Sequence, residues 1–212
     1  MTRHTDPNRI LRRAGLLEIR PSVTWEMLDA GASKAFAVSD HQICHIYLND
    51  KSCLNRVVSL FEKEPGTRKV IFGEERKKYG LDHDRAGDVI LMAEPDNWYT
   101  YYYWEDDKLA PDFARCVDIH RKVGYDPVEL FMDPKNPLVK LRAATALLKK
   151  KLGFRYYMDV IPLDASLIQG SHGTPADNAA EAPLLIGDKS LVASGSMPMT
   201  AVRDVILKSV TG

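Results

Sequence analysis

The sequence has few cysteines, no long apolar run and no excess of charge of either sign. Its three cysteines, Cys44, Cys53 and Cys116, are odd in number and are never spaced as a CxxC pair. This pattern argues against a disulfide framework and against a zinc site built from thiolates. No apolar stretch approaches the roughly 20 residues of a bilayer-spanning helix, and the polar N-terminus lacks the apolar centre of a signal peptide. We therefore expect a cytoplasmic protein without a membrane partner.

The charge is balanced, because 29 basic residues face 29 acidic ones and the formal net charge is zero. Such a chain has no overall field that attracts nucleic acid, so no nucleic-acid partner is expected. A phosphate-bearing substrate would have to be attracted locally, for example by bound cations. With 212 residues, 45% of them hydrophobic, the chain can bury the core of one domain.

Apolar runs alternate with helical patterns along the chain. Strands are expected near residues 35–38, 43–48, 69–72, 87–93, 98–104 and 183–187, and helices near 6–17, 52–62, 74–79, 138–152 and 200–210. The run 35–38 has no polar alternation, which is typical of a strand buried on both faces. The pattern predicts an α/β protein with a largely parallel sheet flanked by helices. The segment from about 94 to 136, broken by prolines and Gly124, is interpreted as an irregular excursion.

Asp40 and His41 directly follow the apolar run 35–38. Ligands of open α/β sheets gather at the carboxyl ends of the strands, so these side chains are well placed for chemistry. A carboxylate oxygen and an imidazole nitrogen together suit zinc or manganese. Taken alone, however, such a pair is more often a polar turn that ends a strand.

A second candidate motif is Gly170-Ser171-His172-Gly173. Glycines allow unusual backbone dihedrals, so a histidine among them can approach a fixed point closely. Glycine-rich loops also contain histidine by chance, and the separation of His172 from His41 along the chain does not establish closeness in space.

The order of these motifs resembles the C-terminal half of type I phosphodiesterases and nucleotide pyrophosphatases of the alkaline phosphatase superfamily. Ser39-Asp40-His41 is similar to that family's Ser-Asp-His-Gly motif, and Gly170-Ser171-His172-Gly173 to its Gly-Thr-His-Gly motif, which precedes an apolar strand such as 183–187. Further stretches resemble a bacterial branch of the family, namely 93–96, 98–104, 110–115, 118–122 and 124–131.

The resemblance implies that Asp40 and His41 bind one divalent cation and that His172 binds the other. The family uses two divalent cations: one activates a threonine or serine nucleophile, and both stabilise charge on the transferred phosphoryl group. Zinc is the expected metal, with manganese as the alternative. The implied activity is hydrolysis of phosphodiester or pyrophosphate bonds, with a nucleotide or another phosphodiester small molecule as the substrate.

The sequence departs from the family pattern in two respects. Gln42 stands where the family usually has glycine, which leaves the ligands but alters the turn. The family's nucleophile and remaining ligands lie in an N-terminal half, and the 39 residues before Asp40 contain no matching set. We therefore expect residues 1–212 to be the C-terminal portion of an alkaline-phosphatase-like domain that lacks the nucleophile and associates with an N-terminal half or with itself. The alternative is a non-catalytic binding or assembly module.

Other polar residues have both functional and structural interpretations. His120 and Arg121 are candidate substrate-binding residues; Arg121 or Lys122 could contact a substrate phosphate or could fix the loop through salt bridges. His45, inside a predicted strand, is favoured as a structural histidine. The cluster Asp82-His83-Asp84 is favoured as a polar turn, and the aromatic run 98–104 as core or interface rather than a base-stacking platform.

Overall fold

The computed structural model describes residues 1–175, 188, 190–191 and 197–211. The chain divides into two compact units, Met1–Thr174 and Pro175–Gly212. The second unit contains the short helix η7 (Met199–Ala201) and helix α4 (Val202–Thr211), close to the expected helix 200–210. The strand expected at 183–187 lies outside the described residues. All the other elements belong to the first unit.

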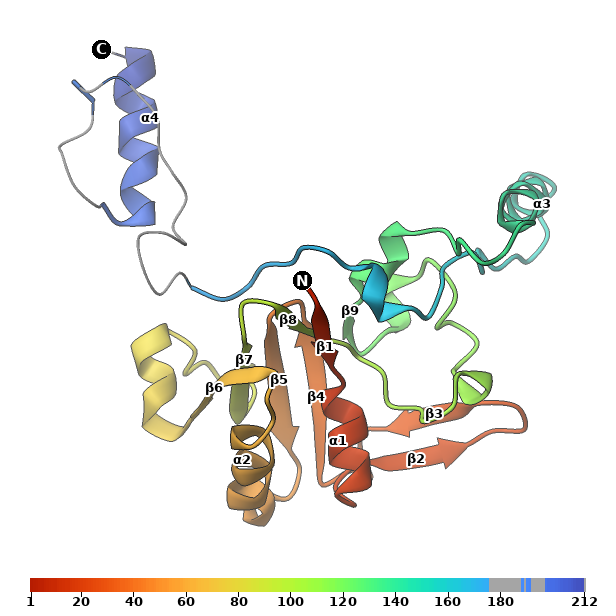
Figure 1. Cartoon of the computed structure of the whole chain (residues 1–212), viewed down its shortest axis with the longest axis horizontal. Helices are drawn as coiled ribbons and strands as arrows, with labels where there is room; N and C mark the ends of the chain where they lie inside the picture. The colour runs from red at the N-terminus through yellow and green to blue at the C-terminus, as the bar shows by residue number, and fades with distance from the viewer. Residues whose placement is uncertain (176–187, 189, 192–196, 212) are drawn as a thin grey trace. The chain divides into compact units, whose positions relative to one another are not determined.

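A five-stranded sheet forms the centre of the first unit (Figure 1). Its strands lie in the order β6 (Thr67–Phe72), β7 (Val89–Ala93), β5 (Ile43–Leu48), β4 (Ala35–Asp40) and β9 (Gly124–Tyr125). The first three neighbouring pairs are antiparallel, and only β4 and β9 run parallel. The α/β class is confirmed, but the sheet is mostly antiparallel rather than largely parallel. For β4 and β5 the direction follows from their connection, because only His41 and Gln42 join them, whereas a parallel connection needs a crossover of a dozen residues or more.

Strand β4 is covered less completely than its apolar sequence predicted. Ala35, Ala37 and Ser39 are buried, whereas Phe36 and Val38 are only half-buried. On this second face the Phe36 ring stacks on Tyr47 of β5, with 5.4 Å between the ring centroids. The expectation of a strand buried on both faces was therefore wrong, because here large side chains of neighbouring strands shield one another.

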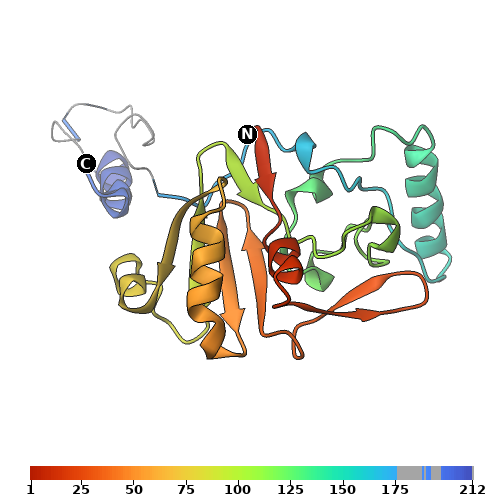
Figure 2. The ribbon, with the colours of Figure 1, turned by 60° about the horizontal axis from the view of Figure 1, so that its bottom comes forward.

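Helices α1 (Pro7–Arg13) and α2 (Leu54–Glu62) pack on the sheet (Figure 2). Leu11 of α1 and Phe61 of α2 belong to the main core together with apolar side chains of β4, β5 and β7. The buried side chain of Asn8 fastens α1 to β4, because its amide nitrogen donates to the Ala37 carbonyl at 2.9 Å and its oxygen accepts from the Ala37 N–H at 2.8 Å. Asn8 thus satisfies strand backbone groups that would otherwise lack partners.

Three strands outside the central sheet were not expected. β1 (Arg3–Thr5) pairs in parallel with β8 (Asn97–Tyr99), while β2 (Glu18–Pro21) and β3 (Glu26–Asp29) form an antiparallel hairpin. Short 3-10 helices connect the elements: η1 (Lys51–Cys53), η2 (Gly73–Tyr79), η3 (Asp107–Leu109), η4 (Ile119–Arg121), η5 (Pro127–Leu130) and η6 (Ala165–Leu167). The three cysteines are free and buried.

The aromatic run 98–104 is core. Only its first residues form a strand, β8, but all six aromatic side chains are buried: Trp98, Tyr99, Tyr101, Tyr102, Tyr103 and Trp104. Burial excludes these rings from stacking on a nucleobase at the surface.

Helix α3 (Val139–Lys151) agrees with the predicted helix 138–152. Lys149, Lys150 and Lys151 lie in its last turn, where cations interact favourably with the helix dipole, and Gly153 follows with φ 78°. In Figures 1 and 2 the helix lies away from the sheet, at an end of the first unit. None of the helices in the described part of the chain has the length and apolar character needed to cross a bilayer.

Candidate metal centre

The turn between β4 and β5 consists of His41 and Gln42. His41 has φ 56° and is the one non-glycine residue in the left-handed region among the residues described. Two-residue hairpin turns favour positive φ because it matches the twist of the flanking strands. The left-handed conformation costs a residue with a Cβ roughly 1–2 kcal/mol, and such strain often occurs at functional sites.

His41 contacts residues that are far away in the sequence. Its Nδ1 lies 2.9 Å from the Ser171 hydroxyl, 130 positions along the chain. The ring centroids of His41 and His172 are 4.1 Å apart, and Tyr125 of β9 stacks on His41 at 4.7 Å. The structure therefore brings His41 and His172 together, while their role as metal ligands stays a prediction.

Backbone contacts hold the loop 170–173 against this turn. The Gln42 N–H donates to the His172 carbonyl at 2.9 Å. Gly173 adopts φ 121°, and a Cβ at this position would lie 3.5 Å from the backbone nitrogens of Gln42 and Ile43. Glycine is required here by the backbone dihedral, so the interpretation of this loop as one that approaches a fixed point is supported.

Gln42 has a structural role that the sequence did not reveal. Its side chain is buried, and its Nε2 lies 3.2, 3.3 and 3.2 Å from the carbonyl oxygens of Glu94, Pro95 and Asn97. The side-chain amide thus fastens the turn to the connection between β7 and β8. The only signal in the sequence was the departure from the usual glycine, which indicated an altered turn but not this anchoring.

The electrostatic surroundings favour a neutral His41. Burial lowers its pKa, the neighbouring His172 lowers it further, and Asp40 opposes this shift. A neutral imidazole has the lone pair that metal binding requires. Asp40 is more exposed, with 64% of its side chain accessible, and its Oδ1 lies 4.0 Å from His41 Nε2.

The donor chemistry of these residues fits a divalent cation in part. Asp40 offers a carboxylate 4.0 Å from the Nε2 of His41, and the His172 ring lies next to the His41 ring. Two ligands of one tetrahedral zinc are about 3.4 Å apart, given bonds of about 2.1 Å, so the 4.0 Å separation is slightly too wide. Within the described ranges, moreover, no three His, Cys, Asp or Glu side chains are arranged to hold an ion. These residues therefore suit an incomplete ligand set.

The candidate substrate-binding residues lie on and beside η4. His120 is exposed, while Arg121 contacts Asp112 at 3.3 Å and Asp118 at 4.0 Å. Lys122 is fully buried between Asp126, at 3.3 Å, and Glu129, at 2.6 Å. Burial makes Lys122 a structural residue rather than a phosphate ligand, and the ion pairs of Arg121 match its loop-fixing interpretation.

Two further histidines have local partners. His45 Nδ1 accepts a hydrogen bond from the Gly87 N–H at 3.0 Å, and burial lowers the His45 pKa. His83 is exposed, and its Nδ1 accepts from the Arg85 N–H at 3.1 Å. Both arrangements agree with the structural interpretations made from the sequence.

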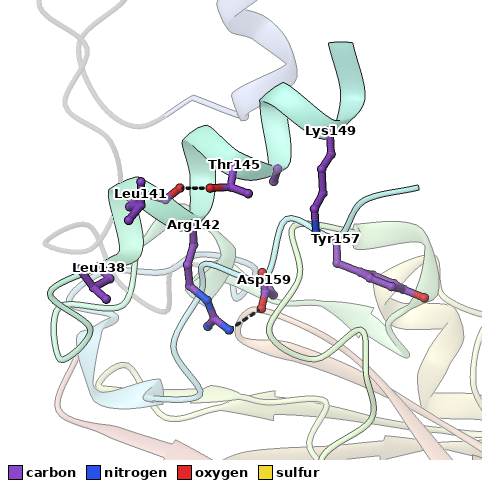
Figure 3. A pocket seen from close by; sticks show the side chains of 8 residues that line it. Leu138, Leu141, Arg142, Thr145, Lys149, Tyr157 and Asp159 are labelled. Atoms are coloured by element: carbon purple, nitrogen blue, oxygen red, sulfur yellow. Dashed lines mark hydrogen bonds and ion pairs between the residues drawn. The ribbon is translucent and has the colours of Figure 1, made fainter. Parts of the chain in front are cut away.

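A hollow of about 340 Å³ lies beside α3 (Figure 3), and neither His41 nor His172 is among the residues that line it. The side chains around it are Leu138, Leu141, Arg142, Thr145, Ala146, Lys149, Tyr157 and Asp159. Across it Arg142 pairs with Asp159 at 3.1 Å. None of the predicted site residues borders this hollow, so we place the candidate site at the β4–β5 turn.

Comparison with known proteins identifies one matching family. The family model for type I phosphodiesterase / nucleotide pyrophosphatase matches residues 2–126, more than half of the chain. No curated protein and no solved structure gave a match. The matched residues include Asp40 and His41 but end before His172, which is joined to them by the contacts described above.

Proposed function

Because the chain belongs to the type I phosphodiesterase / nucleotide pyrophosphatase family, we propose that it contributes to metal-dependent hydrolysis of phosphodiester or pyrophosphate bonds in a nucleotide or similar small molecule. Asp40 and His41 would hold one divalent cation and His172 a second, with zinc favoured and manganese as the alternative. The observation that carries this proposal is the 4.1 Å contact between the His41 and His172 rings, which joins the family-matched region to a histidine outside it.

The bound cations would supply positive charge that stabilises the phosphoryl group during transfer. The residues of this chain would hold that charge in place. Burial keeps His41 neutral and able to bind, and the Gln42 anchor restrains the turn that carries both Asp40 and His41. Stacking by Tyr125 covers part of the His41 ring and restricts its motion.

We further propose that residues 1–212 do not supply the nucleophile. The family's nucleophile precedes its Asp-His pair, and the residues before Asp40 form the β2–β3 hairpin and α1 without a matching motif. A completing N-terminal half would then be needed for turnover. The runner-up is a non-catalytic binding or assembly module, and the absence of a three-ligand group among the described residues favours it.

A metal-binding and activity experiment tests these proposals. Zinc and manganese affinities of the purified 212-residue chain would be measured by chelator competition, and turnover with a chromogenic phosphodiester. We expect measurable zinc binding, weakened by His41→Ala and by His172→Ala, with little or no turnover. His83→Ala is the matched control, because His83 is exposed and distant in sequence from both motifs.

The possible outcomes separate the alternatives. Failure of the wild-type chain to bind either metal would contradict the metal centre and favour the non-catalytic module. Robust metal-dependent turnover that His172→Ala abolishes would show instead that a nucleophile lies within the 212 residues.

Association with an N-terminal half or with a second copy is also proposed. Helix α3 and its flanking residues expose large apolar side chains: Leu138, Leu141, Leu147, Leu148, Leu152 and Phe154. Soluble monomers rarely leave large contiguous apolar patches uncovered. This surface supports a protein partner at α3.

A further inference from the structure

We infer that Ser171 is a positioning residue for His41: its Oγ accepts a hydrogen bond from His41 Nδ1–H and thereby leaves Nε2 available to a cation. Its link to catalysis rests on the proposed metal-dependent function. The hydrogen bond itself can be tested on the metal-free chain.

The geometry gives Ser171 this role. The Ser171 Oγ and His41 Nδ1 are 2.9 Å apart, a normal hydrogen-bond distance. The hydroxyl cannot easily move away, because the adjacent residue His172 is bonded through its carbonyl to the Gln42 N–H. The turn and the loop therefore meet at two points, one between backbones and one between side chains.

The direction of the hydrogen bond determines which ring nitrogen can bind a cation. A neutral imidazole carries a proton on one nitrogen and a lone pair on the other. Nε2 lies on the side of Asp40, 4.0 Å from its Oδ1, so Nε2 is the nitrogen that can share a cation with Asp40. Binding through Nε2 places the proton on Nδ1, where the Ser171 oxygen accepts it.

Burial makes this acceptor important. Only 14% of the His41 side chain is accessible, so water does not readily replace a missing partner at Nδ1. Residues that accept the second N–H of a metal-binding histidine typically change metal affinity by about 10- to 100-fold when they are removed. Ser171 is therefore expected to affect cation affinity without touching the cation.

The test uses Ser171→Ala, Ser171→Thr and the control Ser209→Ala, whose serine is exposed on α4. We expect Ser171→Ala to weaken zinc binding about 10- to 100-fold. The threonine variant, which keeps the hydroxyl, should restore most of the affinity, and the control should leave it unchanged. Unaltered zinc affinity in Ser171→Ala would overturn the inference.

The second measurement is nitrogen NMR of ¹⁵N-histidine-labelled protein, which distinguishes protonated from unprotonated ring nitrogens. In the zinc-loaded wild-type chain, His41 should carry its proton on Nδ1. In the metal-free chain, Ser171→Ala should change the His41 ring signals and leave those of His83 unchanged.

These results separate the inference from the proposed function. If the wild-type chain does not bind zinc, the metal-dependent function fails, yet the metal-free spectra still test the Ser171–His41 bond. Identical His41 signals in wild type and Ser171→Ala would overturn the inference. Zinc bound through Nδ1, or a phosphoryl group found covalently attached to Ser171 after incubation with substrate, would overturn it as well.

Discussion

Replacing Gly124 with alanine should strongly destabilise the chain at the edge of the candidate site. Gly124 has φ +113°, and a Cβ there would lie 2.1 Å from the Ser39 carbonyl oxygen and 2.7 Å from the Ser39 nitrogen. Both obstacles are backbone atoms of β4, so they cannot rotate away as a side chain could. The strand pair β4–β9 would have to separate, and Tyr125 would lose its position against His41.

The magnitude follows from two contributions. An unfavourable backbone conformation costs about 1–3 kcal/mol, and overpacking costs about another 1–3 kcal/mol, so we expect a loss of about 2–6 kcal/mol in unfolding free energy. Gly80→Ala is the matched control. Gly80 also has positive φ, at +65°, but a Cβ there would meet nothing within 4 Å. Gly80→Ala should therefore lower the unfolding free energy by only about 1–2 kcal/mol.

Urea unfolding measures the difference, with the fluorescence of the buried Trp98 and Trp104 as the signal. With a urea m-value of about 2 kcal/mol/M, the midpoint should fall by about 1–3 M for Gly124→Ala and by less than about 1 M for Gly80→Ala. Equal losses in the two variants would refute the close approach of β9 to β4.

Three further outcomes are expected. Gln42→Ala should lower the unfolding free energy by about 2–3 kcal/mol, because three backbone carbonyls lose their side-chain partner. Gln169→Ala, which removes an exposed side chain, is the control and should change the unfolding free energy little. Similar losses in the two variants would contradict the anchoring role of Gln42. In the presence of chelator, the unfolding free energy should fall as the pH drops below about 6.5. Folding lowers the pKa values of His41 and His45, so the unfolded chain takes up protons at a higher pH than the folded chain. A flat stability profile between pH 7.5 and 5 would contradict this. Sedimentation should detect dimers or larger species at micromolar concentration, and Leu148→Glu should reduce them; a monomeric wild-type chain would remove the case for association through α3.

Local patterns in the sequence predicted many elements of the first unit. The strand 43–48 was predicted with its observed bounds, and α3 was predicted within one residue at each end. Both have a clear periodicity and well-marked ends. His45 was correctly interpreted as structural, because its neighbours indicated a strand.

The direction of the strands could not be predicted in the same way. The apolar run 35–38 suggested a parallel sheet, yet a buried-type run is also compatible with an antiparallel strand whose second face is covered by Phe36 and Tyr47. The short spacing between β4 and β5 carried the decisive information, since two residues allow only a hairpin. Asn8 and Gln42 act through contacts with distant backbone groups, which no local pattern encodes.

Contacts at the candidate site join residues inside the family match to residues beyond its end at residue 126. Asp40 and His41 lie within the matched residues 2–126, whereas Ser171 and His172 lie beyond them. Two hydrogen bonds, from the Gln42 N–H to the His172 carbonyl and between His41 and Ser171, join these parts at one turn. Because both bonds depend on the strained left-handed turn at His41, the position of the second histidine depends on the same turn that presents the first. A change that relaxes this turn should therefore disturb both histidines together rather than one of them alone.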